Sequence, residues 1–372
     1  MKALLHLVAA LLLQTPALSM AQPVVPRYRI DLLPTPPAGF NLAPHKINNR
    51  GMVAGSIFEA VNGSPEAFVY RAGRLTPLGT LGGLASEATD LNERGDVVGN
   101  LTHLDGVVRP FLYRRGRMAE IPLPDGARGD AEALDINNTG HVLGRVYLET
   151  GGVRAFFYDG RRSAFLDDAG LSSPSFAALN DRDEIAGDAM AADNNDRDAL
   201  IYHQGMVTRL PPPPDADPLR DITRSFVVGF NNAGQVLLNN HGTIDGHAED
   251  EDYAFVYQDG RYTQFGPNFF QANSMNERGW ALGVSYDGFD EVVVTPGLYR
   301  DGSFHTLDEL VRPADAGRWT WTYVRGINDF GAFVGRASGS AFIARPVPEP
   351  AAAVMMLVGL YAIGMARRRR GR

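Results

Sequence analysis

The chain has 372 residues and 44% of them are hydrophobic, a share typical of a folded protein and too high for wholesale disorder. It contains no cysteine, which excludes a disulfide scaffold, a thiolate nucleophile, an iron–sulfur cluster and Cys-ligated zinc. The formal charge of −8 argues against a nucleic-acid partner, because phosphate contacts need a basic face.

The first 21 residues predict a secretory signal peptide. Lys2 supplies a positive start, residues 3–13 are apolar apart from His6, and Ser19-Met20-Ala21 offers small residues at a cleavage site. An uncleaved membrane anchor is disfavoured because the apolar run is far below the ~20 residues that a span needs. We expect cleavage after Ala21 and export from the cytoplasm.

Seven copies of one unit fill the segment 27–346. Each copy begins with an apolar residue and an asparagine, with spacings of 44, 45, 43, 51, 45 and 52 residues between Asn48, Asn92, Asn137, Asn180, Asn231, Asn276 and Asn328. A glycine follows three residues after most of these asparagines, which predicts a turn. The Asn side chain can accept from backbone amides there, while the glycine adopts a positive φ.

A second element, of the Ala-Phe-Val-Tyr type, follows each turn, as at 67–70 and 254–257. It is apolar on both alternating faces, which indicates a strand covered on both sides. A glycine turn and a further short strand usually come next. Together with the stretch before each asparagine, this gives four strands in about 45 residues, the length of a propeller blade.

The seventh unit ends after 341–343 without its last strand, whereas residues 28–33 resemble that missing strand. An N-terminal strand that completes the last blade would close the ring and remove exposed sheet edges. We therefore predict an all-β fold, a propeller of seven four-stranded blades closed by the N-terminal strand. An open β-solenoid or stacked array is the alternative.

The units are similar to HAF repeats, an extracellular bacterial repeat family named for its Ala-Phe element. The matching residues are Leu78-Gly79-Thr80-Leu81-Gly82-Gly83, Ser86, Ala88, Leu91-Asn92, Gly95 and Gly99. Asp183 replaces the turn glycine in the fourth unit, and Leu238 replaces the closing glycine in the fifth, so these two blades depart from the pattern. The resemblance implies a secreted repeat protein and supplies no catalytic residues to carry over.

Enzyme signatures are missing from the sequence, which has no H-E-x-x-H, no G-x-S-x-G elbow, no Walker loop and no dinucleotide fingerprint. Two acidic stretches remain as candidates for a Ca²⁺ site: Asp193, Asp196 and Asp198 in the fourth unit, and Glu249, Asp250 and Asp252 in the fifth. Clustered oxygens outside the cytoplasm suit this ion, which takes about 6–8 oxygen ligands. Both stretches are expected in hairpin loops, where solvated charge without a metal is the normal filling and the favoured interpretation.

An alternating aromatic row, Trp319, Trp321 and Tyr323, leads into the seventh unit. Alternation predicts that the three rings share one face of a strand. An exposed row could stack on sugar rings, whereas a row buried between blades would be ordinary core. Burial is the favoured interpretation, because both faces of a blade are normally covered.

The segment 347–372 has three parts: Val347, Pro348, Glu349 and Pro350, an apolar run over 351–366, and then Arg367, Arg368, Arg369 and Arg370. Sixteen helical residues at about 1.5 Å each reach about 24 Å, slightly short of a ~30 Å hydrocarbon core, and snorkelling arginines can cover the difference. We expect a transmembrane helix with its arginines in the cytoplasm. A buried core helix with a basic tail, the alternative, leaves the abrupt end of the apolar run unexplained.

This C-terminal segment resembles the PEP-CTERM sorting signal of Gram-negative bacteria. The resemblance implies recognition by an exosortase, cleavage near the Pro-Glu-Pro, and a host that makes extracellular polysaccharide. Removal of the signal peptide and of everything after Pro350 would leave 29 of the 35 basic residues against 43 acids, a charge of −14.

The sequence as a whole predicts an exported, non-catalytic propeller at the cell surface or in the extracellular matrix. Its expected partners are the secretion machinery, an exosortase and an exopolysaccharide, with no cofactor apart from the candidate Ca²⁺. The alternative is a propeller-type polysaccharide lyase or glycosidase with a site at the central channel. Two carboxylates, or a carboxylate and a histidine, would have to meet at one end of that channel for such an enzyme.

Overall fold

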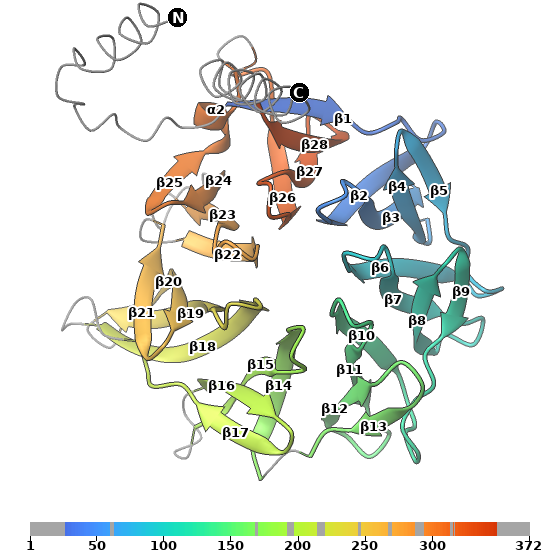
Figure 1. Cartoon of the computed structure of the whole chain (residues 1–372), viewed down its shortest axis with the longest axis vertical. Coiled ribbons are helices and arrows are strands. Elements are labelled where there is room, and N and C mark those ends of the chain that lie inside the picture. The colour runs from blue at the N-terminus through green and yellow to red at the C-terminus, as the bar shows by residue number, and fades with distance from the viewer. Residues whose placement is uncertain are drawn as a thin grey trace, which may run out of the picture. The chain divides into compact units, whose positions relative to one another are not determined.

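Antiparallel four-stranded sheets surround a common centre in the computed structural model (Figure 1). The structure describes residues 27–59, 63–167, 170–191, 197–213, 220–244, 247–266, 270–286, 294–312, 315 and 317–347. The predicted signal peptide and residues 348–372 of the predicted sorting segment lie outside this part of the chain. Among the described residues, no helix has the length and apolarity needed to cross a membrane.

Each blade runs from an innermost strand at the centre to an outermost strand at the rim. The first blade consists of β2 (Phe40–Ile47), β3 (Val53–Glu59), β4 (Glu66–Arg71) and β5 (Arg74–Pro77). The second consists of β6 (Ala85–Leu91), β7 (Val97–Thr102), β8 (Val108–Arg114) and β9 (Arg117–Glu120). The third consists of β10 (Ala131–Ile136), β11 (Val142–Tyr147), β12 (Val153–Tyr158) and β13 (Ser163–Phe165).

The fourth and fifth blades are also four-stranded, although their repeats depart from the pattern. They consist of β14 (Ser172–Leu179), β15 (Ile185–Met190), β16 (Arg197–His203) and β17 (Met206–Arg209), and of β18 (Arg220–Phe230), β19 (Val236–Ile244), β20 (His247–Gln258) and β21 (Arg261–Phe265). A single parallel bridge, between Arg197 and Arg224, joins these two blades into one sheet. Seven blades are therefore confirmed.

The last two blades complete the ring. The sixth consists of β22 (Phe270–Met275), β23 (Ala281–Tyr286), β24 (Val294–Arg300) and β25 (Ser303–Thr306), followed by the short helix α2 (Leu307–Leu310). The seventh consists of β26 (Trp321–Ile327), β27 (Phe333–Ala337), β28 (Ser340–Pro346) and the N-terminal β1 (Tyr28–Leu32).

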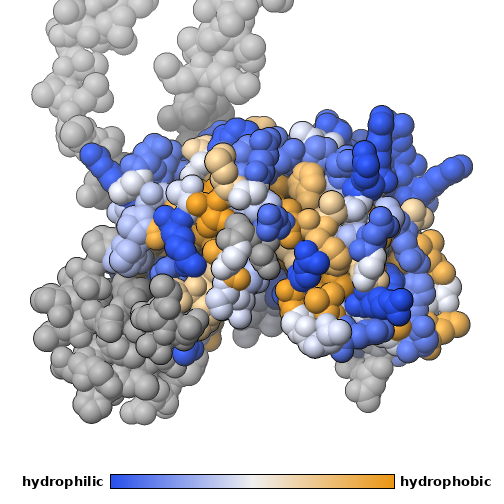
Figure 2. Space-filling model, turned by 90° about the horizontal axis from the view of Figure 1, so that it is seen from below, coloured by the Kyte–Doolittle hydropathy of each residue, from blue (hydrophilic) through white to orange (hydrophobic). Residues whose placement is uncertain are grey.

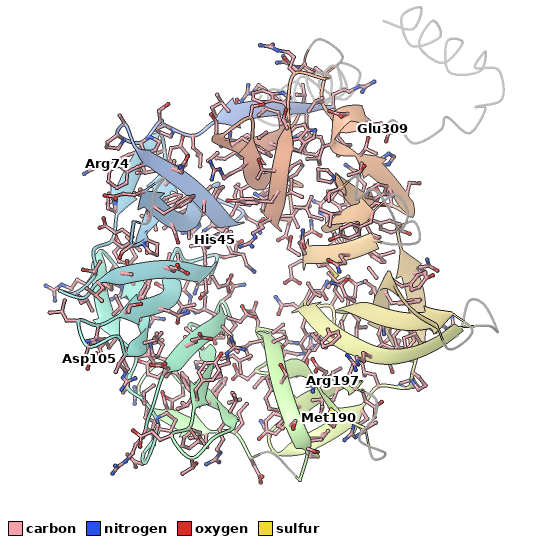
Figure 3. All side chains as sticks on the ribbon, turned by 180° about the vertical axis from the view of Figure 1, so that it is seen from behind. His45, Arg74, Asp105, Met190, Arg197 and Glu309 are labelled. Atoms are coloured by element: carbon pink, nitrogen blue, oxygen red, sulfur yellow. The ribbon has the colours of Figure 1, made fainter. Side chains whose placement is uncertain are left out.

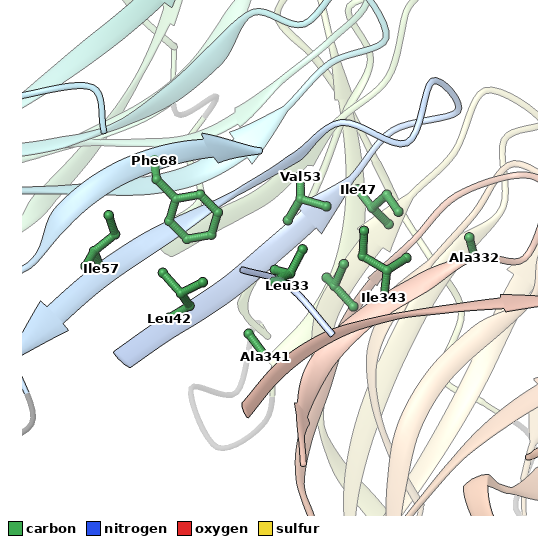
Figure 4. Close-up of a cluster of buried hydrophobic side chains, with 10 residues drawn as sticks. Leu33, Leu42, Ile47, Val53, Ile57, Phe68, Ala332, Ala341 and Ile343 are labelled. Carbon is green, nitrogen blue, oxygen red and sulfur yellow. The ribbon is translucent and has the colours of Figure 1, made fainter. Parts of the chain in front are cut away.

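Closure by the N-terminal strand is confirmed. β1 pairs antiparallel with β28 from Tyr28 opposite Pro346 to Leu32 opposite Phe342, which covers the edge that β28 would otherwise expose. Tyr28 is 1% exposed and its ring packs 5.2 Å from that of Phe333. An apolar cluster between the seventh and first blades, which includes Leu33, Leu42, Ile47, Val53, Ile57, Phe68, Ala332, Ala341 and Ile343, continues the core across the closure (Figure 4).

The glycine seven residues after the repeat asparagine, present in every unit but the fifth, allows close packing in the blade. In the second blade Gly99 lies opposite Phe111 of the neighbouring strand, and a Cβ at Gly99 would come within 1.9 Å of the Glu87 carbonyl oxygen and 2.7 Å of the Phe111 ring. The glycine thus makes room for the phenylalanine of the Ala-Phe element. The third and seventh blades repeat this pairing with Gly144 opposite Phe156 and with Gly335 opposite Phe342.

A β-bulge interrupts every innermost strand two or three residues before its repeat asparagine. A bulge turns the chain locally and redirects side chains, so consecutive residues of these strands line the central channel. Seen from the side, the described surface is largely hydrophilic with apolar patches between the charged residues (Figure 2).

Candidate functional site

The seven repeat asparagines form a buried belt around the channel, each between 2% and 6% exposed. Within its own turn, Oδ1 of Asn48 accepts hydrogen bonds from the amides of Arg50 and Met52, as the turn prediction requires. Its Nδ2 donates across the blade boundary to the Asn92 carbonyl oxygen at 3.0 Å. The same 2.9–3.2 Å link joins Asn92 to Asn137, Asn137 to Asn180, Asn231 to Asn276, Asn276 to Asn328 and Asn328 to Asn48.

The residues that follow these asparagines form a second circle, here called the mouth ring: Asn49, Glu93, Asn138, Asp181, Asn232, Glu277 and Asp329. The backbone amide of each donates to a side-chain oxygen of the next, at 2.7–2.9 Å, and the last link from Asp329 to Asn49 closes the circle. Burial raises the pKa of Glu93 and Glu277, and the charges on Asp329 and Asp181 raise it further against the lowering effect of the amides. This end of the channel is therefore acidic.

Behind the mouth ring lies a cavity of about 390 Å³ that is lined by the innermost strands of all seven blades. Lys46, Asp90 and Asp135 occupy the same position in the first three blades, two residues before the repeat asparagine. Their four counterparts in the other blades are small: Ala178, Gly229, Ser274 and Gly326. The channel therefore has one charged wall and one wall of small residues.

The charged wall is held together by hydrogen bonds between its side chains. Lys46 Nζ lies 3.2 Å from Asp90 Oδ1, and the carboxyl groups of Asp90 and Asp135 are hydrogen-bonded to each other. Burial and the charge on Asp90 place the pKa of Asp135 well above its usual range. Burial would also raise the pKa of Asp90, but the Lys46 ammonium and the bond from Asp135 hold it below its usual value. The charged form is therefore less favoured at Asp135 than at Asp90.

The two channel carboxyls also tie neighbouring blades together. Asp90 Oδ2 accepts from the Ile136 amide at 3.0 Å, and Asp135 Oδ2 accepts from the Leu179 amide at 2.7 Å. Carboxyl pairs that cleave glycosidic bonds stand about 5–5.5 Å apart in retaining enzymes and about 6.5–9.5 Å apart in inverting ones. Two carboxyls in direct contact leave no space for a sugar or a water between them.

A second pocket, of about 440 Å³, includes His45, Glu87, Asn273 and Arg325 from the first, second, sixth and seventh blades. Figure 3 labels His45 at the inner edge of its blade, facing the centre of the ring. Its Nδ1 lies 2.6 Å from the Ala88 carbonyl oxygen, and burial lowers its pKa. A histidine and a carboxylate thus share this pocket, with the histidine ring held against the backbone.

The structure tests the predicted loop for only one of the two acidic stretches. Asp193 and Asp196 lie outside the described residues, and Asp198 belongs to β16, where it pairs with Arg209 at 2.8 Å. Glu249, Asp250 and Asp252 belong to β20, so their placement in a hairpin loop is wrong: the β19–β20 ladder continues to Ile244 opposite His247. No cluster of three or more acidic or histidine side chains in the described parts of the chain could hold a metal ion.

The prediction that the aromatic row shares one face is also wrong. Trp321 lies opposite Ala337, but a bulge at Thr322 places Tyr323 opposite Arg336, the next residue of β27, so the two rings face opposite sides. The Trp319 and Trp321 rings remain 6.3 Å apart, and Trp321 Nε1 donates to Asp308 at 3.0 Å. Sugar stacking stays a prediction for these two tryptophans alone.

The belt, the mouth ring and the charged wall were not predicted from the sequence. All three recur at fixed offsets from the repeat asparagines, so an alignment of the seven units displays them as columns. Such an alignment does not show the ring geometry that brings equivalent positions of neighbouring blades into contact.

No family model matches the sequence, and neither does any curated protein. The propeller domain of the Trilobed protease from Pyrococcus furiosus is 11% identical, covers 83% of this chain and 98% of its own, and has a TM-score of 0.56. The Pyrococcus horikoshii acylaminoacyl peptidase is 10% identical over 85% of this chain with a TM-score of 0.56, and this chain spans 54% of its length. Aleuria aurantia lectin is 10% identical over 77% of this chain and 99% of its own, with a TM-score of 0.40. At such identities the first two likenesses show the β-propeller fold alone.

Proposed function

We propose that this protein is an exported, non-catalytic β-propeller that binds a partner at the cell surface or in the extracellular matrix. The observation that carries the non-catalytic part is the bonding of Asp90 and Asp135. Each carboxyl is engaged by the other and by a backbone amide of the next blade. Groups used to join blades are poorly placed to move protons on a substrate.

The proposed localisation rests on the two ends of the sequence. Residues 1–21 have the composition of a signal peptide, and the segment 347–372 resembles a PEP-CTERM signal. We propose that the C-terminal helix anchors the chain in the inner membrane until an exosortase cuts near Glu349. The propeller then remains outside the cytoplasm of a Gram-negative host, where an extracellular polysaccharide is the ligand that the HAF and PEP-CTERM resemblances favour.

A lyase or glycosidase acting in the channel is the second candidate. It is favoured by the meeting of two carboxyl groups and a lysine in an open cavity of about 390 Å³. The direct contact between the carboxyls counts against it.

The proposed localisation can be tested by intact-mass analysis of the protein recovered from the envelope and medium of its native host. We expect a mass that lacks residues 1–21 and the segment after the Pro-Glu-Pro. A variant with Glu349→Ala should retain the C-terminal segment, if Glu349 is part of the signal. Full-length protein in the cytoplasmic fraction would contradict export.

A further inference from the structure

Five arginines line a groove between the first and second blades, here called the basic groove. Its volume is about 840 Å³, and its charged residues are Arg71, Arg74, Arg94, Arg114, Arg115 and Asp96. The groove therefore carries a net charge of about +4 in a chain whose net charge is −8. Figure 3 labels Arg74 on the outer part of the first blade, away from the channel.

An equivalent groove between the fifth and sixth blades shows which of these features the fold itself dictates. This sister groove has a volume of about 650 Å³ and is built from the same repeat positions: Arg261 stands for Arg74, and Arg278 for Arg94. Its two arginines are balanced by Asp259 and Asp301. The fold thus produces the hollow, whereas the excess of arginine belongs to the basic groove.

Most of the positive charge in the basic groove is uncompensated. Arg114 donates to Asp96 at 3.0 Å, and Arg94 donates to the Thr139 carbonyl oxygen at 3.1 Å. Three arginines are exposed, and within the described residues their guanidinium groups have no ion-pair or hydrogen-bond partner: Arg71, Arg74 and Arg115. Their guanidinium groups are available to a ligand from solution.

The hairpin turn at Arg115 also separates the basic groove from the sister groove. Arg115 and Gly116 have φ values of 53° and 80°, which is the two-residue hairpin turn that favours asparagine, aspartate or glycine at its first position. The fifth and sixth blades have Asp259 and Asp301 at this position. The same positive φ recurs at the equivalent turns of the first and fourth blades, at Ala72 and Gln204, so the conformation belongs to the repeat. What singles out the basic groove is that its second-blade turn carries an arginine, which adds a guanidinium group to the lining.

We propose that the basic groove binds a carboxylate-bearing polysaccharide, a chain of uronic acid sugars. The arginine fork matches a carboxylate in bidentate geometry. The lining also includes Met52, Val69, Thr76 and Tyr113, which offer apolar and hydroxyl surface to sugar rings. Arg114 and Arg115 also line the groove between the second and third blades together with Arg117, so the basic surface is long enough for a polymer.

A nucleic acid fits this surface less well. Proteins that bind single strands stack successive bases on aromatic side chains. Within the described part of the chain, the lining of the basic groove contains one aromatic ring, that of Tyr113. The proposal deepens the proposed function, on which its biological meaning rests, by naming the ligand class and the site.

Binding of polygalacturonate to the full chain, with neutral dextran as the control polymer, tests the proposal. We expect binding that weakens with salt, about fivefold weaker binding for Arg115→Asn, and at least about thirtyfold weaker binding for the triple variant Arg71→Ala, Arg74→Ala, Arg115→Asn. Arg261→Ala, which changes the sister groove at the position of Arg74, should bind within about twofold of the unchanged protein. Arg115→Asn should keep its thermal midpoint, because asparagine suits the turn.

Three results would overturn the proposal: full affinity in the triple variant, an equal loss in Arg261→Ala, or a single-stranded oligonucleotide that binds the unchanged protein more tightly than polygalacturonate. Failure to bind any polyanion would also overturn it. The proposed function fails differently, through cytoplasmic full-length protein or through cleavage of a polymer, and neither of those results depends on the groove variants.

Discussion

Replacing Asn92 with alanine is expected to lower the free energy of unfolding by about 3–5 kcal/mol. Asn92 is 4% exposed, and its side chain accepts from the amides of Arg94 and Asp96 while donating to the Asn137 carbonyl oxygen at 3.0 Å. Alanine removes these three bonds and a fourth, 3.4 Å long, from Nδ2 to Asp96. It leaves backbone groups of two blades without partners, each at a cost of about 1–3 kcal/mol where buried. Denaturant unfolding followed by circular dichroism measures the loss.

Two further variants separate the turn from the belt. Asn92→Asp keeps an oxygen for the turn amides but loses the donor to the next blade and places a second carboxyl beside Asp96, so its loss is an upper limit for the cross-blade bond. Asn180 donates its Nδ2 to Glu184 of its own turn at 2.6 Å, so Asn180→Ala should destabilise the ring less than Asn92→Ala. Equal losses for Asn92→Ala and Asn180→Ala would contradict a role of the belt in joining blades.

The channel wall gives the second large effect, and its two aspartates are expected to differ. Asp90→Asn leaves the Lys46 ammonium without its carboxylate, which we expect to lower the free energy of unfolding by about 2 kcal/mol. The Lys46 side chain is 42% exposed, so the loss stays below that of a fully buried pair. Asp135→Asn substitutes an amide for a carboxyl whose raised pKa disfavours its charged form. Its NH₂ can donate to Asp90 and its oxygen can accept from Leu179, so the change should cost less than about 1 kcal/mol near neutral pH.

The pH dependence of stability distinguishes the two aspartates further. The folded-state pKa of Asp135 is raised, so the stability it contributes is complete below its ordinary value of about 3.9 and is lost as the pH rises through its folded value. The pKa of Asp90 is lowered, so its contribution is present above about 3.9 and is lost on acidification. Unfolding free energies between about pH 5 and 9 should therefore fall less with rising pH in Asp135→Asn than in the unchanged protein. Identical slopes would contradict a raised pKa of Asp135 in the folded protein.

Much of the fold follows from the repeat alone. The spacing of Asn48 and its six counterparts predicts seven blades, and the strand-like residues 28–33 predict the closing strand β1. Both features can be recognised from the order of residues along the chain. The turn function of each asparagine is equally local. Its donation to the next blade is not, since the partner carbonyl lies 43 or more residues away and meets it only in the closed ring.

The errors have a similar cause. Alternation places Trp321 and Tyr323 on one face only in a regular strand, and the bulge at Thr322 has no glycine or proline to announce it. The acidic residues around Asp250 were assigned to a loop because charge is typical of loops, but the long β19–β20 ladder holds their backbone in a strand. The charged wall requires three distant residues, Lys46, Asp90 and Asp135, to be aimed inward by bulges of the same kind.

The most direct test of a non-catalytic binding propeller is to mix the purified full chain with the extracellular polysaccharide of its native host. Co-sedimentation and the number of polymer chain ends are then measured in the same sample. We predict saturable co-sedimentation with no increase in chain ends over many hours. A rise in chain ends that Asp90→Asn abolishes would contradict this function and establish the channel as an active site, and a complete lack of association would contradict binding.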